Sequence, residues 1–124
     1  MSDFFEDSDL VYAYTRAQAI ADGVLIDVSE MAKEAGITFP VALTSSVYAD
    51  VCNIPPSKSH QDTKGRLWDL LTMFVSNARK FRSSQFSYDF IMHVGNKTYY
   101  TVKAVCSPGD DCEPVVTLML PNED

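Results

Sequence analysis

Cysteine and histidine side chains are the first candidates for chemistry in this sequence, because thiolates and imidazoles bind metals and act as nucleophiles or bases. Cys106 and Cys112 flank a Ser-Pro-Gly-Asp-Asp segment and could meet across a turn, where His93 could approach them. A Cys-x-x-Cys pair and a clear fourth ligand are missing, so we predict no metal site. With Cys52 the cysteines number three, and an odd number argues against a closed disulfide framework.

The same search predicts no catalytic residues. The chain has no Gly-x-Ser-x-Gly motif, and its other histidine, His60, lies in a polar Ser-Lys-Ser-His-Gln segment. Neither a Gly-x-Gly-x-x-Gly nor a Gly-Lys-Ser/Thr sequence occurs, and Gly23 and Gly36 are placed to end helices. We therefore expect a protein that is not an enzyme and holds no cofactor.

Carboxylates are the most distinctive chemical group of the chain, which has 17 Asp and Glu against 10 Lys and Arg and a net charge of −7. Residues 1–56 hold nine acids and two bases, residues 57–104 three acids and eight bases, and residues 105–124 five acids and no base. This acidic balance argues against direct nucleic-acid binding and fits either a basic partner or simple solubility. A charge distribution of this kind can also be no more than a solvated surface.

If the carboxylates bind a partner, the two acidic segments are the first places to look, and a helical pair one turn apart is the second. The candidate partner-binding residues are Asp3, Glu6, Asp7, Asp9, Glu30, Glu34, Asp110, Asp111 and Glu113. The sequence leaves open whether the acidic segments share one face of the molecule.

A chain of 124 residues forms one ordinary domain, which we place over residues 1–124. No apolar run approaches the roughly 20 residues of a membrane helix, and the N-terminus is acidic where a signal peptide is basic. We therefore expect a cytoplasmic monomer. Its first half predicts short helices over 16–22 and 30–35, a strand or extended link over 24–28, and a helix from Pro40 to about residue 52.

The strongest periodic signal predicts a helix over residues 64–82 with one apolar stripe, in which Leu67, Leu70, Leu71 and Phe74 recur at steps of three and four. Its polar face carries Arg66 and Asp69, and basic residues in its last turn complement the helix dipole. These basic residues are Arg79, Lys80 and Arg82.

The last third of the chain predicts three strands, over 86–94, 97–105 and 115–120, with Gly95-Asn96 as a hairpin turn. Short connections favour an antiparallel meander, and the long amphipathic helix must cover one face of it. The predicted fold is therefore α+β, with N-terminal helices packed on a C-terminal three-stranded antiparallel meander.

The stretch YTRAQAIADGVLIDVSEMAKEAGI over 14–37, followed by FPVALT over 39–44, resembles an uncharacterised family of small bacterial proteins. Members of that family are carried on plasmids, phages and conjugative elements, often beside anti-restriction genes. The resemblance covers residues 9–50 well and the rest loosely, and the size and acidity of the chain are similar to those of a type I-C anti-CRISPR protein. The family defines no catalytic residues.

The resemblance implies an inhibitor that binds a type I CRISPR effector (Cascade) subunit by acidic DNA mimicry, and so blocks recognition of target DNA and its protospacer-adjacent motif. Two alternatives remain open. One is an accessory protein of a mobile element that binds another host defence protein. The other is a small ligand-binding or enzymatic domain with a pocket between helix and sheet, lined by Tyr88, Tyr99 or Tyr100.

Overall fold

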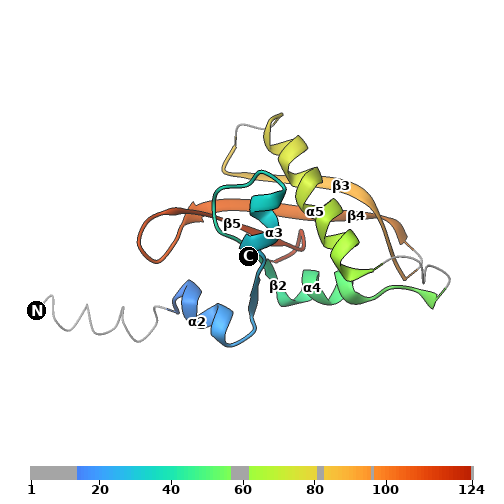
Figure 1. Ribbon diagram of the computed structural model, residues 1–124, viewed down its shortest axis with the longest axis horizontal. Helices are drawn as coiled ribbons and strands as arrows, with labels where there is room; N and C mark the ends of the chain where they lie inside the picture. Colours follow the sequence, from blue (N-terminus) through green and yellow to red (C-terminus); the bar gives the residue numbers. More distant parts are fainter. Residues whose placement is uncertain (1–13, 57–61, 81–82, 96, 124) are drawn as a thin grey trace, which may run out of the picture.

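A computed structural model describes residues 14–56, 62–80, 83–95 and 97–123 of the chain (Figure 1). The elements, in chain order, are α2 (Arg16–Ala21), β1 (Leu25–Asp27), α3 (Ser29–Glu34), β2 (Val41–Thr44), α4 (Ser45–Cys52), α5 (Thr63–Ala78), β3 (Gln85–Val94), β4 (Lys97–Pro108) and β5 (Pro114–Met119). No helix in these ranges is long and apolar enough to cross a membrane.

The strands form one five-stranded mixed sheet in the order β1-β2-β5-β4-β3. Strand β2 runs parallel to β5, with Val41 opposite Val116, and the other neighbours are antiparallel. The predicted three-stranded antiparallel meander is therefore wrong. Strands β3, β4 and β5 do pair in sequence order, but β1 and β2 extend the sheet beyond β5 and make β5 its central strand.

Strand β2 occupies positions where the sequence predicts the start of a helix. Its residues Val41, Ala42 and Leu43 are fully buried, which gives a continuous apolar run that fits a helix as well as a strand covered on both faces. The helix begins later, at Ser45, where the hydroxyl of Thr44 accepts a hydrogen bond from the backbone N–H of Val47. The sheet therefore continues as far as the residue that caps α4.

The main core lies between one face of the sheet and helices α3, α4 and α5 (Figure 1). The predicted stripe of α5 supplies Leu67, Leu70, Leu71 and Phe74, and alternate residues of β3 face it, with Phe74 stacked on Phe86 at 5.7 Å between ring centroids. The predicted amphipathic patterns thus meet as expected.

Helix α5 is shorter than predicted. It begins after Asp62, whose carboxylate accepts a hydrogen bond from Gly65 N–H at 2.6 Å, and it ends at Ala78. Arg79 and Lys80 follow the helix, so its last turn contains no basic residue, and Arg82 lies outside the described residues. The helix ends early because the chain must reverse direction before β3 begins at residue 85.

The opposite face of the sheet is covered only in part. Helix α2 packs there, because its Arg16 guanidinium donates to the hydroxyl of Thr117, which alternates along β5 with the core residues Val116 and Leu118. Over β3 and β4 the side chains on this face are exposed or half-buried, and the exposed ones include the cross-strand neighbours Ile91 and Tyr99.

Candidate functional site

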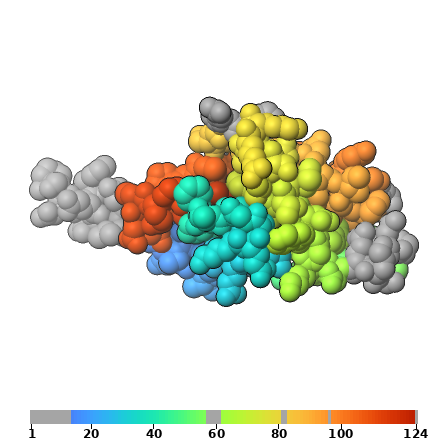
Figure 2. Space-filling model, turned by 45° about the horizontal axis from the view of Figure 1, so that its top comes forward, coloured from blue at the N-terminus to red at the C-terminus, as the bar shows by residue number. Residues whose placement is uncertain are grey.

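The turn between β4 and β5 holds three of the predicted partner-binding acids, and it lies against α2 (Figure 2). Asp110 accepts hydrogen bonds from the backbone N–H groups of Arg16 at 2.8 Å and of Ala17 at 3.0 Å. These bonds lower the pKa of Asp110 below its ordinary value, and the bond from Arg16 N–H has the larger effect. Asp110 therefore ties the turn to the start of α2, in addition to the hydrogen bonds made by the α2 cap residue Thr15.

The side chain of Arg16 is the centre of this region. Its guanidinium is half-buried and donates to the hydroxyl of Thr117 at 2.7 Å and to the carbonyl of Val116 at 2.9 Å. Burial lowers the pKa of Arg16, whereas the carboxylates of three acidic residues act in the opposite direction. These residues are Asp27, Asp110 and Glu113, which come from the end of β1 and from the β4–β5 turn.

The name acidic end is used below for Arg16, the three acids Asp27, Asp110 and Glu113 that act on it, and Asp111 of the same β4–β5 turn. Asp27, Asp110 and Asp111 are exposed, and Glu113 is half-buried. The Glu113 carboxylate accepts a hydrogen bond from Asp111 N–H at 3.2 Å and lies so close to Gly109 that a Cβ there would collide with it. Asp27 accepts from the backbone and hydroxyl of Ser29. The carboxylates of Asp27, Asp110 and Glu113 thus stabilise the local fold more than that of Asp111 does.

Of the remaining predicted acids in the described part of the chain, Glu30 adjoins the acidic end and Glu34 does not. Glu30 lines a groove together with Asp27, but Glu34 lines a different groove with Asp62 and Lys64 at the start of α5. The two members of this helical pair therefore line neighbouring grooves, which share Met31. Asp3, Glu6, Asp7 and Asp9 lie outside the described residues.

The thiol and imidazole groups form no metal site within the described part of the chain, where no cluster of three His, Cys, Asp or Glu residues could hold an ion. All three cysteines are free thiols. Cys106 is half-buried, and this burial raises the pKa of its thiol, which makes it a weaker nucleophile at neutral pH.

The tyrosines expected as alternative lining residues of a pocket between helix and sheet have different surroundings. Tyr88 is buried, and its hydroxyl donates to the carbonyl of Leu70 at 2.9 Å. Tyr100 donates to the carboxylate of Asp50 at 2.6 Å, and Tyr99 is exposed on the other face of the sheet. Tyr99 and Tyr100 both line one groove together with Asp50 of α4, whereas Tyr88 belongs to the core.

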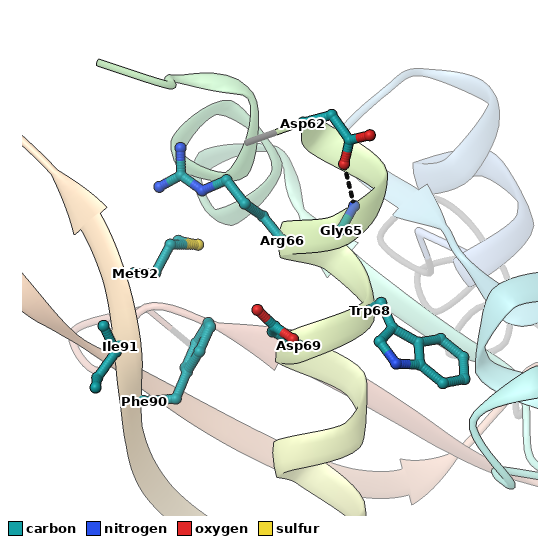
Figure 3. Close-up of a pocket in the computed structure, with 8 residues that line it drawn as sticks. All are labelled: Asp62, Gly65, Arg66, Trp68, Asp69, Phe90, Ile91 and Met92. Atoms are coloured by element: carbon teal, nitrogen blue, oxygen red, sulfur yellow. Dashed lines mark hydrogen bonds between the residues drawn. The ribbon is translucent and has the colours of Figure 1, made fainter. Parts of the chain in front are cut away.

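A different cavity, of about 330 Å³, lies between the first half of α5 and strand β3 (Figure 3). Its lining residues are Asp62, Gly65, Arg66, Trp68, Asp69, Phe90, Ile91 and Met92. Figure 3 shows the carboxylate of Asp69 pointing from α5 into the space in front of Phe90, with Met92 below the guanidinium of Arg66.

Arg66 is 4% exposed, although the helical pattern places it on the polar face. Its guanidinium donates to the carbonyl of Asn53, just after α4, at 3.0 Å and to that of His93 in β3 at 2.7 Å. Burial lowers its pKa, against the effect of the Asp50 carboxylate. The prediction was wrong because α5 is covered on this flank as well as along its stripe, so a residue four positions before Leu70 becomes interior.

Comparison with known proteins gives one match. All 124 residues match a family described as "Family of unknown function (DUF6573)". The chain belongs to this family. No significant match to a curated protein was found, and none to a solved structure. The description of the family assigns no activity, so any functional reading of this member depends on its own residues.

Sequence reasoning missed Arg66, Asp27 and Trp68 as site residues. The burial of Arg66 had a local signal, because it precedes Leu70 by one helical turn and so adjoins the apolar stripe. No local sequence signal indicated that Asp27 lies near the β4–β5 turn, because this arrangement depends on the contact between residues 16 and 110.

Proposed function

We propose that this protein is an inhibitor that presents carboxylates to the basic, DNA-binding surface of a host defence protein. The expected target is a subunit of a type I CRISPR effector in the bacterial cytoplasm, where the inhibitor blocks recognition of target DNA and of its protospacer-adjacent motif. The protein acts as an anti-CRISPR of a mobile element. It carries out no reaction, and it needs no cofactor.

The observation that carries this proposal is the bond between Asp110 and the backbone of α2. It brings acidic residues that are far apart in the sequence to one end of the molecule. The carboxylates of Asp27, Asp110 and Glu113 lie near the partly buried cation Arg16, and the exposed Asp111 follows Asp110 in the same turn. A cluster of this sign attracts the Lys and Arg side chains that bind phosphates, and it accelerates their approach.

The experiment reverses one charge at the acidic end. Asp111→Lys keeps Asp110 and Glu113 in place, so α2 stays attached to the turn. Glu34→Lys is the matched control, because it makes the same change in charge in a groove that no acid of the acidic end lines. An exposed charge pair contributes up to about 1 kcal/mol, and reversal replaces attraction by repulsion, so we expect Asp111→Lys to weaken binding to purified type I effector about tenfold.

The complex should also weaken as salt rises from 0.1 to 1 M, since the screening length falls from about 10 Å to about 3 Å. Protection of phage DNA in cells that carry a type I system gives the functional readout. Equal binding and equal protection by wild type and Asp111→Lys would exclude the acidic end as the contact. Failure of wild-type protein to bind a type I effector at all would exclude the proposed target.

A further inference from the structure

We propose that the cavity between α5 and β3 binds a free α-amino acid with an apolar side chain. In this arrangement the ligand carboxylate accepts a hydrogen bond from Nε–H of Arg66, and the ligand ammonium group pairs with the carboxylate of Asp69. This binding site is separate from the acidic end and from the inhibitor function proposed above.

The first observation is an unpaired donor. Nε of Arg66 is the one buried side-chain nitrogen or oxygen atom with no hydrogen-bond partner among the described residues. Both terminal nitrogens of the same guanidinium are bonded to backbone carbonyls, at 3.0 and 2.7 Å, and this fixes the plane of the group. A buried donor without a partner is costly, and a guanidinium edge is well suited to a carboxylate.

The second observation is the charge of the other lining groups. Asp62 and Asp69 line the same cavity, and the Asp69 carboxylate points into it (Figure 3). A simple anion would be repelled by these two carboxylates, and a simple amine would leave Nε of Arg66 without an acceptor. A ligand with both a carboxylate and an ammonium group satisfies each side, which identifies the zwitterion.

The third observation is the size and polarity of the space. A cavity of about 330 Å³ is at the lower end of the range that small-molecule sites occupy, so it suits an amino acid better than a nucleotide or a larger cofactor. The ring of Phe90 and the thioether of Met92 line it beside the charged groups. These apolar groups provide a surface for an apolar ligand side chain.

The test uses the intrinsic fluorescence of Trp68, which is the single tryptophan of the chain and lines the cavity. The full-length protein is titrated with L-leucine, L-methionine and L-phenylalanine. For leucine, two analogues each lack one charged group: 4-methylpentanoate has no ammonium, and 3-methylbutylamine has no carboxylate. We expect a saturable change in fluorescence with at least one of the amino acids, and affinity at least about tenfold weaker for both analogues of leucine.

Asp69→Asn removes the partner of the ammonium group and should weaken amino-acid binding about tenfold. Asp22→Asn is the matched control and should bind as wild type does, because Asp22 is exposed and lies outside the cavity. Isothermal calorimetry with the same probes checks that the fluorescence reports binding. Asp69 is a surface residue of α5, so loss of binding in Asp69→Asn can be separated from loss of folding by circular dichroism.

Two results would overturn this proposal. If none of the three amino acids gives a saturable signal, Nε of Arg66 is satisfied by water. If the amine or the acid alone binds as well as L-leucine, the ligand is not a zwitterion. Neither result bears on the inhibitor function, because effector binding is measured separately and is expected to be unchanged in Asp69→Asn.

Discussion

Replacement of Arg66 by methionine tests whether the buried guanidinium holds α5 to its neighbours. The side chain connects three elements, since it extends from α5 to the carbonyl of Asn53 beyond α4 and to that of His93 in β3. Methionine has a similar length and fills the space, but it donates no hydrogen bond. Both carbonyls would therefore lose a charged donor.

The expected loss follows from two opposing contributions. Hydrogen bonds from a charged donor contribute about 1.5–3 kcal/mol each, so two bonds amount to about 3–6 kcal/mol. Removal of a buried charge with an unpaired Nε–H also removes its desolvation cost, and this offsets the loss of the two bonds by on the order of a few kcal/mol. We expect Arg66→Met to lower the free energy of unfolding by about 2–3 kcal/mol net.

Urea and thermal unfolding, followed by circular dichroism, measure this change. For a chain of 124 residues, 1 kcal/mol corresponds to about 4 °C in Tm, so the midpoint should fall by about 8–12 °C. Arg79→Met is the matched control, because Arg79 is exposed just after the same helix, and it should change stability by no more than about 0.5 kcal/mol. If Arg66→Met is as stable as wild type, the desolvation cost of the buried guanidinium equals the stabilisation by its two hydrogen bonds. The guanidinium then does not hold α5 to its neighbours.

Two further predictions concern the hydrogen bonds of one side chain each. Because the pKa of Asp110 is lowered in the folded state, its contribution to stability is fully present above the ordinary carboxyl range and is lost as pH falls through the lowered pKa. In an NMR titration, the amide signals of Arg16 and Ala17 should shift together with the carboxyl carbon of Asp110. Asp110→Asn should abolish this shared transition. Tyr88→Phe removes the bond to the carbonyl of Leu70 and should lower the free energy of unfolding by about 1 kcal/mol in urea, whereas an unchanged midpoint would mean that this bond adds nothing to stability.

Local periodicity predicted much of the second half of the fold. One face of α5 and one face of β3 are buried, and this produces the apolar stripe that includes Leu67 and Phe74 and the alternation from Phe86 to Met92. Both patterns can therefore be recognised from residues that are close together in the sequence. The hairpin after Val94 was predicted from a different local signal, its turn residues: Val94 pairs with Lys97, and Gly95 has a φ of 60°.

Pairings between distant segments could not be predicted in this way. The parallel contact of β2 with β5 joins Val41 to Val116, and no periodic pattern in either short strand specifies the other as its neighbour. The role of Asp110 has the same origin, since it caps a helix 94 residues earlier in the chain. The charge of Asp110 predicted a partner-binding residue, but its hydrogen bonds to the start of α2 give it a structural role as well.

The central place of β5 has a consequence for how this chain folds. β5 is the last of the five strands in the chain, yet it lies between β2 and β4. Until β5 is available, β1 with β2 and β3 with β4 are two separate ribbons, each with an unpaired edge. Closing the sheet then requires contacts of high sequence separation, which fold slowly and leave edges open to association with other chains. During synthesis on the ribosome, the sheet can therefore be completed only after the residues of β5 have emerged.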